Sequence, residues 1–174
     1  RWIKMVTGRS ILHVNQGVGK VYSKTELKGY YNDLTEKVEK GKELGPDEVP
    51  TQTLKSGVIE FSIEIFQYGL ACYDLFLIEK DDKYLNKFKT MVMWAVANQA
   101  EDGSWITFDY VYPDHPYSAM AQGEGASLLL RAYALTNNEI YLDSARKALD
   151  FMITPLNEGG TAFIEGDSIY LKEY

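Results

Sequence analysis

Apolar residues recur every three or four positions from about residue 59 onward, which is the spacing of one face of an amphipathic helix. The first such face consists of Ile63, Phe66, Leu70, Tyr73 and Leu77. A polar turn with a helix cap is expected at 80–82. A second face follows this turn and consists of Tyr84, Leu85, Phe88, Met91, Val92 and Ala95. The pattern therefore predicts two antiparallel helices joined by a short turn.

The same plan returns later in the chain, with helices expected over 119–135 and 139–152. The later apolar face lies 57 positions after the earlier one, since positions 84 and 95 become 141 and 152. Its members are Tyr141, Leu142, Ala145, Ala148, Leu149 and Met152. In each copy a helix rich in small residues precedes a helix with a single apolar face. Such repeats predict stacked helix pairs with an inner and an outer row.

We predict a mainly α fold, an incomplete α/α toroid of antiparallel helix pairs with two copies visible and a small C-terminal β-hairpin. Alternating residues over 161–165 and 168–171 predict the hairpin. A solenoid of helical hairpins has the same local pattern, but the long aromatic loop at 105–117 favours the toroid. Residues 1–56 are expected to form an irregular N-terminal arm or linker, and residues 57–174 the partial toroid. Since two pairs are too few to close a toroid, we expect the natural protein to continue.

The composition argues against some classes of function but does not identify one. The formal charge of -7 argues against nucleic acid as a partner, which would require a basic stripe. An aromatic share of 13% suits a carbohydrate cleft, because flat rings stack on sugar faces. The chain has no apolar run long enough for a membrane segment. His13 and His115 are not at metal-ligand spacing and the carboxylates are scattered, so neither a metal nor a cofactor is expected.

The helix expected over 119–135 is the best candidate for a binding wall. Its small residues allow close approach of neighbours on several sides. Tyr117, Glu124 and Arg131 lie seven residues apart and so share one stripe. The alternative is a packed core helix in which Arg131 pairs with Glu124 across two turns.

Three short strings carry a resemblance to a known family. They are Glu-Ile-Phe-Gln-Tyr-Gly-Leu at 64–70, Tyr-Ser-Ala-Met-Ala-Gln-Gly at 117–123 and Leu-Arg-Ala-Tyr at 130–133. The strings resemble the C-terminal helical domain of D-glucuronyl C5-epimerases, which convert glucuronate to iduronate within heparan-type polysaccharides. The resemblance implies an incomplete α/α barrel, an anionic polysaccharide substrate and a homodimer.

The resemblance also implies roles for single residues. Tyr174 matches a catalytic acid/base and Glu173 the carboxylate that assists it. Tyr117, Gln122, Glu124 and Arg131 are then expected to bind substrate. The family commonly has Gln where this chain has Glu124, which leaves the identity of the uronate polymer open. Other catalytic tyrosines and an arginine of the family would lie beyond residue 174.

C5 epimerisation removes a proton beside the sugar carboxylate and returns one to the opposite face. A site must therefore neutralise the developing charge and place an acid and a base on the two faces of the ring. A polysaccharide lyase begins with the same proton abstraction and then expels the C4 substituent, so the residue types fit it equally. A non-catalytic helical interaction module is the third reading.

Overall fold

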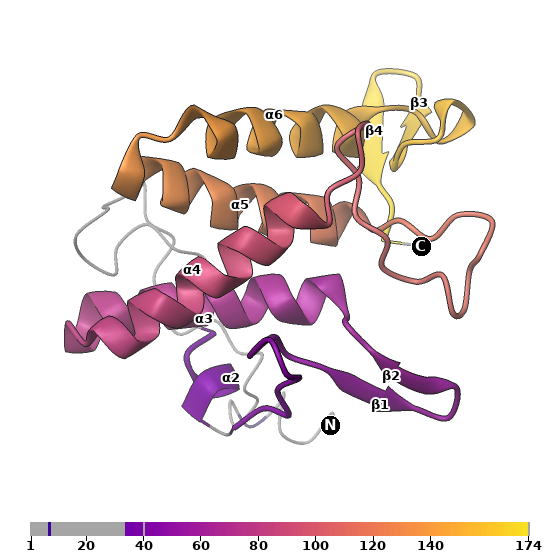
Figure 1. Ribbon diagram of the computed structural model, residues 1–174. Helices are drawn as coiled ribbons and strands as arrows, with labels where there is room; N and C mark the ends of the chain where they lie inside the picture. Colours follow the sequence, from indigo (N-terminus) through magenta and orange to yellow (C-terminus); the bar gives the residue numbers. More distant parts are fainter. Residues whose placement is uncertain (1–6, 8–33, 40, 174) are drawn as a thin grey trace.

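The computed structural model describes residues 7, 34–39 and 41–173, and helices dominate this part of the chain (Figure 1). A short helix and a hairpin precede two long helix pairs, and a second hairpin follows them. In chain order the elements are α2 (Glu36–Glu39), β1 (Gln52–Leu54), β2 (Gly57–Ile59), α3 (Ser62–Glu79), α4 (Asp82–Ala97), α5 (Ala119–Thr136), α6 (Glu139–Ile153), a 3₁₀ turn (Leu156–Glu158), β3 (Ala162–Glu165) and β4 (Ser168–Leu171).

The 57-residue repeat is confirmed at the level of helix ends. Both ends of α5 lie 57 positions after those of α3. Each of these helices ends in a left-handed residue, Lys80 with φ 58° and Asn137 with φ 53°. The next helix begins at a capping side chain, Asp81 for α4 and Asn138 for α6, which accepts a hydrogen bond from a backbone N–H of the first turn. The polar turns thus fix both pairs in the same geometry.

Burial separates an inner from an outer row. Fourteen of the eighteen residues of α3 are buried, whereas α4 buries only Phe88, Met91, Val92 and Ala95. The contrast recurs between α5, which buries nine residues, and α6, which buries three. Figure 1 shows α3 and α5 side by side, with α4 and α6 packed outside them. The predicted helix pairs are therefore present, with α3 and α5 as the inner row.

The buried face of α6 differs from its prediction at the C-terminal end. Ala145 and Ala148 are fully buried as expected, but Leu149 is 37% exposed and Phe151 is 6% exposed. The ring of Phe151 packs edge-on against Tyr117, with ring centroids 4.9 Å apart. The aromatic loop before α5 thus draws a different side of the helix into the core than the spacing alone predicts.

The loop after each helix pair contains a glycine at which it closely approaches a neighbouring backbone. A Cβ on Gly103 would lie 2.3 Å from the Lys147 carbonyl oxygen, and one on Gly160 would lie 2.2 Å from the Thr154 carbonyl oxygen. No side chain fits at such distances, and Gly103 also has a φ of +92°. These glycines are again 57 positions apart, so the repeat extends into the loops.

Two antiparallel hairpins flank the helices. The C-terminal hairpin is confirmed, with Ala162 paired to Leu171 and Glu165 to Ser168. The first hairpin pairs Gln52 with Ile59 and so spans position 56, where the arm was expected to end. The division into arm and toroid stays a prediction. Among the described residues, none of the helices is long and apolar enough to cross a bilayer.

Candidate functional site

The parallel inner helices bring equivalent positions of the two repeats into contact. Gln67 Nε2 on α3 donates to Glu124 Oε1 on α5 at 2.8 Å. Seven residues further along both helices, Arg131 Nη1 donates to Asp74 Oδ1 at 3.3 Å. Each pair is 57 positions apart, as expected where two helices run side by side in the same direction. These polar pairs lie where the inner helices would otherwise present only small and apolar side chains.

The Arg131–Asp74 pair corrects the structural role considered for Arg131. A partnership with Glu124 was possible by spacing, but the charged partner in the structure is Asp74 on the neighbouring helix. Both side chains are buried, and the guanidinium carbon lies 5.7 Å from the centre of the Tyr73 ring. Arg131 therefore ties α5 to α3.

One oxygen of Glu124 accepts a hydrogen bond, whereas the other, the buried Oε2, has no hydrogen-bond partner among the described residues. Burial raises the pKa of Glu124 to about 7, and the nearby Glu173 carboxylate adds to the rise. The hydrogen bond from Gln67 and the charge of Lys37 act in the opposite direction on this pKa. Glu124 is thus a carboxyl group that changes protonation near neutral pH.

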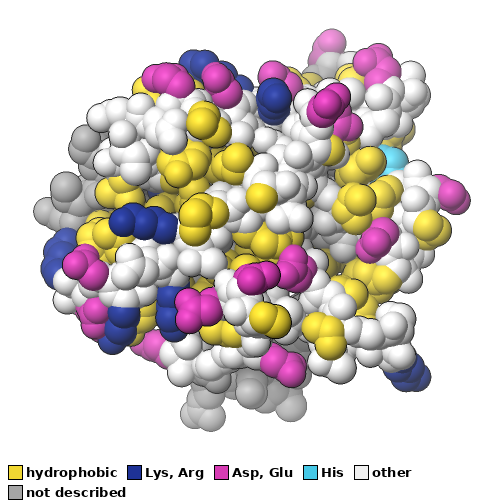
Figure 2. All heavy atoms as spheres, in the orientation of Figure 1, with side chains coloured by type: hydrophobic (Ala, Val, Ile, Leu, Met, Phe, Trp, Pro, Cys, Tyr) yellow, Lys and Arg dark blue, Asp and Glu magenta, His cyan; other side chains and the backbone are white. Residues whose placement is uncertain are grey.

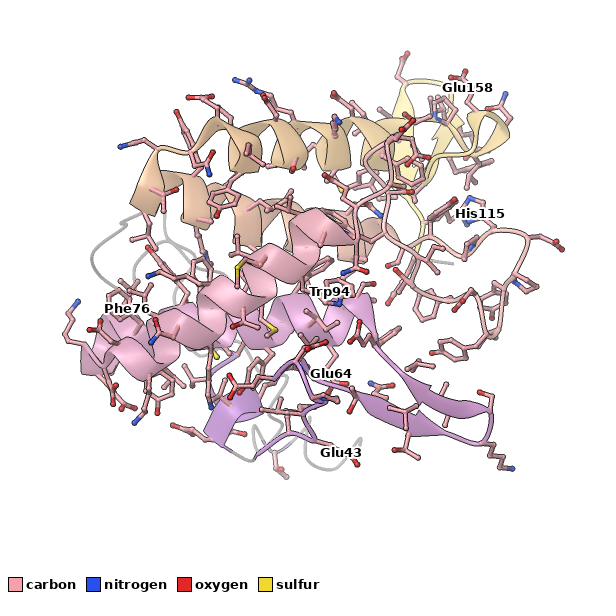
Figure 3. The ribbon with its side chains drawn as sticks, in the orientation of Figure 1. Glu43, Glu64, Phe76, Trp94, His115 and Glu158 are labelled. Carbon is pink, nitrogen blue, oxygen red and sulfur yellow. The ribbon has the colours of Figure 1, made fainter. Side chains whose placement is uncertain are left out.

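The N-terminal arm contributes cations to the same region. Lys42 forms an ion pair with Glu64 near the start of α3, and Gln52 Nε2 donates to the other carboxylate oxygen of Glu64 at 2.7 Å. The side chain of Glu64 thus connects the first turn of α3 to β1 and to the segment that leads into it (Figure 3). Burial and the charge of Lys42 lower the pKa of Lys37, whereas Glu124 and Glu64 act to raise it.

The end of the chain returns to the start of α5. The Ala119 N–H donates to the Lys172 carbonyl at 2.8 Å, and the Lys172 N–H donates to the Thr161 carbonyl at 2.8 Å. These bonds hold Glu173 near enough to Glu124 for the two carboxyl groups to interact electrostatically. Tyr174, the predicted acid/base, lies outside the described residues, as does His13.

Two predicted substrate-binding residues lie in structural contacts. Gln122 is fully buried and, with its amide oriented to satisfy both atoms, donates to the Gly103 carbonyl and accepts from the Trp105 N–H, each at 3.2 Å. Tyr117 is half-buried between Phe151 and His115, with ring centroids 4.9 and 5.7 Å away. Their roles in binding stay predictions.

The aromatic loop 105–117 divides into a buried and an exposed part. Trp105 is 1% exposed, and its indole N–H donates to the Ala95 carbonyl at 2.8 Å, so it belongs to the core. His115 Nε2 lies 2.9 Å from the Gly160 carbonyl and anchors the far end of the loop. Tyr110 and Tyr112 are exposed, and Figure 2 shows hydrophobic side chains gathered on this side of the molecule beside the histidine.

A separate hollow of about 470 Å³ lies between the end of α4, the residues after β2 and the aromatic loop. Trp94, Asn98 and Gln99 line it together with the carboxylates of Glu60 and Asp109. Its described lining contains no Lys or Arg, so it offers nothing to balance an anionic sugar. None of the predicted substrate-binding residues lines this hollow.

Sequence reasoning missed Gln67, Glu64 and the lysines of the arm. The signal for Gln67 was present, because position 124 less the repeat of 57 gives position 67. The lysines could not be found this way, since the arm has no counterpart in the repeat. Within the described ranges, no group of three His, Cys, Asp or Glu side chains is placed to hold a metal ion.

Comparison with known proteins agrees with the motif. Residues 108–174 match the family model described as D-glucuronyl C5-epimerase C-terminus. This part of the chain is similar to the C-terminal part of that family. A D-glucuronyl C5-epimerase of Caenorhabditis elegans is 32% identical over 106 residues, which are 56% of this chain. The chain spans 17% of the length of that relative. The family assignment made from the sequence is confirmed, and the matched segment contains α5, α6 and Glu173.

Proposed function

We propose that this chain is part of a uronyl C5-epimerase that converts D-glucuronate to L-iduronate units within an anionic polysaccharide. The observation that carries the proposal is the family match over residues 108–174, which includes both Glu124 and Glu173. The similarity to a D-glucuronyl C5-epimerase extends over 56% of the chain and supports the same reaction.

We infer further that α3–α6 are two pairs of an incomplete α/α toroid. The inner helices run parallel and contact each other through positions 57 residues apart. A constant offset in helix ends, caps and loop glycines is the pattern of a regular ring or arc of helix pairs. The homodimer implied by the resemblance stays a prediction.

The proposed reaction takes the C5 proton of glucuronate on one face of the ring and delivers a proton to the other face. Tyr174 is the proposed acid/base and Glu173 its proton partner. A tyrosine has an ordinary pKa of about 10, so acting as a base requires a neighbouring group that accepts or shares its proton. Glu173 lies next to it in sequence, and the bonds of Lys172 hold this segment against α5.

The remaining predicted residues take two roles in this proposal. Glu124 is the proposed contact to the substrate, because its buried Oε2 has no hydrogen-bond partner among the described residues and its carboxyl group interacts with Glu173. Gln122 and Arg131 position α5, the first through the loop that carries Trp105 and the second through Asp74. Tyr117 orients the aromatic loop through its contacts with Phe151 and His115.

The test is proton exchange on a uronate polymer in deuterated water. We expect deuterium at C5 with the polymer length unchanged. Ultraviolet-absorbing unsaturated ends would indicate a lyase, and the absence of both exchange and oligosaccharide binding would favour a non-catalytic module. Tyr174→Phe in the full protein is expected to abolish exchange, and full exchange in that variant would remove Tyr174 from the proposed mechanism.

A further inference from the structure

We propose that Glu124 binds the carboxylate of a uronate as a neutral carboxylic acid, through a hydrogen bond donated from its Oε2. The inference rests on the proposed function, because it assigns the charge state and binding partner of one residue in the same site. In this role Glu124 determines specificity for anionic sugars, and its contribution to binding depends on pH.

The two oxygens of Glu124 have different environments, and this difference assigns the proton. Oε1 accepts a hydrogen bond from the Gln67 amide at 2.8 Å, which suits the carbonyl oxygen of a neutral acid. The proton of the acid then lies on Oε2, which is buried and lacks a partner among the described residues. A buried donor without an acceptor is costly. An anionic oxygen of a ligand would satisfy it with a charge-assisted hydrogen bond.

Burial favours the neutral form of Glu124 against the opposing charge of Lys37, and a bound anion adds to the effect of burial. The charged groups that act on it are Lys37 on α2 and Glu173 after β4, while α3 presents the neutral Gln67. A second lysine of the arm, Lys42, forms an ion pair with Glu64. An ionised Glu124 would place two protein carboxylates against one lysine before the substrate adds its own negative charge. Protonation removes one of these charges and supplies a donor in its place.

Burial raises the pKa of Glu124 to about 7. The acid form is therefore the major one below this pH and the minor one above it. Since only the acid form donates from Oε2, apparent affinity for a uronate should fall about tenfold between pH 6 and pH 8. A Lys37 contact would act in the same direction, because burial lowers the pKa of this lysine, so the variants at Glu124 are needed to separate the two groups.

Two variants distinguish the effect of the hydrogen-bond donor at position 124 from the effect of its titratable charge. Glu124→Gln keeps a donor of similar shape and removes the titration, whereas Glu124→Leu removes both. Glu165→Gln, at an exposed carboxylate of the distant end of β3, is the matched control. The ligand is an oligosaccharide of glucuronate alternating with N-acetylglucosamine, and its dissociation constant is measured by calorimetry on the full protein at pH 6 and pH 8. Circular dichroism verifies that each variant is folded.

At pH 6 we expect Glu124→Gln to bind within about threefold of the parent and Glu124→Leu to bind at least about tenfold more weakly. The loss of affinity at pH 8 should be present in the parent and in Glu165→Gln and absent in Glu124→Gln. The KM for exchange should follow the dissociation constant while kcat changes little. If the parent binds and exchanges but Glu124→Gln is as weak as Glu124→Leu, or keeps the pH dependence, this inference is wrong and the proposed function stands. If the parent binds no oligosaccharide, both are wrong.

Discussion

The protonation of Glu124 should make the folded state more stable in mild acid than above neutrality, without any ligand. In an unfolded chain this carboxyl has a pKa of 4.5, and in the folded protein burial raises it to about 7. Between these values the folded state holds a proton that the unfolded state has released. The free energy of unfolding must therefore fall as the pH rises through this window and be flat above it.

The size of the effect follows from the two pKa values. A rise from 4.5 to about 7 corresponds to roughly 3 kcal/mol in total, of which about 2.5 kcal/mol is lost between pH 5 and pH 8. For a domain of this size a urea slope of about 2 kcal/mol/M converts that loss into a midpoint about 1 M lower at pH 8. Burial also raises the pKa values of Tyr68 and Cys72, each to about 12, so those groups act at higher pH and do not overlap.

Urea unfolding followed by circular dichroism at pH 5, 6, 7 and 8 measures this effect, with Glu124→Gln as the control. The amide cannot titrate, so the control should lose most of the pH dependence while unfolding cooperatively. A parent protein whose stability rises from pH 5 to pH 8, or a Gln variant that keeps the full slope, would refute the assignment of a raised pKa to Glu124.

Two further predictions use matched pairs. Gly125→Ala should destabilise the fold by about 1–3 kcal/mol, because its Cβ would lie 2.6 Å from the Trp105 ring. In contrast, the Cβ of Gly123→Ala would have only the Met152 sulfur nearby, at 3.7 Å, so this variant should be neutral or stabilising by up to about 1 kcal/mol. Arg131→Met should cost about 3–5 kcal/mol by removing the ion pair of a buried carboxylate on α3, whereas Arg146→Met, at an exposed pair, should cost no more than about 0.5 kcal/mol. The urea midpoints of the four variants measure these changes in stability. Equal destabilisation by the two glycine variants would contradict the packing described for Gly125, and equal destabilisation by the two arginine variants would contradict the burial described for Arg131.

Sequence periodicity predicted the helix pairs well because both physical determinants of such a pair are local. Apolar spacing selects the buried face, and the polar turn carries its own cap, as at Asp81 and Asn138. The prediction was weaker where a distant segment decides burial. Leu149 and Phe151 compete for the core at the end of α6, and the Tyr117 ring from another segment favours Phe151.

The same distinction explains the outcome for the polar stripe of α5. Spacing within one helix correctly aligned Glu124 with Arg131, but each finds its partner on α3. The repeat contained this information, since subtracting 57 leads to Gln67 and Asp74. The electrostatic contribution of Lys37 had no such signal, because the arm is not part of the repeat and its position depends on tertiary contacts.

The two polar contacts between the inner helices differ in what they leave available for chemistry. Arg131 and Asp74 carry opposite charges and are buried together, so their pair is closed and contributes to the packing of the helices. Gln67 is neutral and donates to only one oxygen of Glu124, so the other oxygen, which is buried, has no hydrogen-bond partner among the described residues. Because the Lys172 backbone is bonded to Ala119 and Thr161, the segment that carries Glu173 is held against the N-terminal end of α5. The repeat therefore builds from the same register one ion pair and one contact that leaves a carboxyl oxygen without a partner among the described residues, and the proposed site lies at the end of the inner helices to which the chain returns.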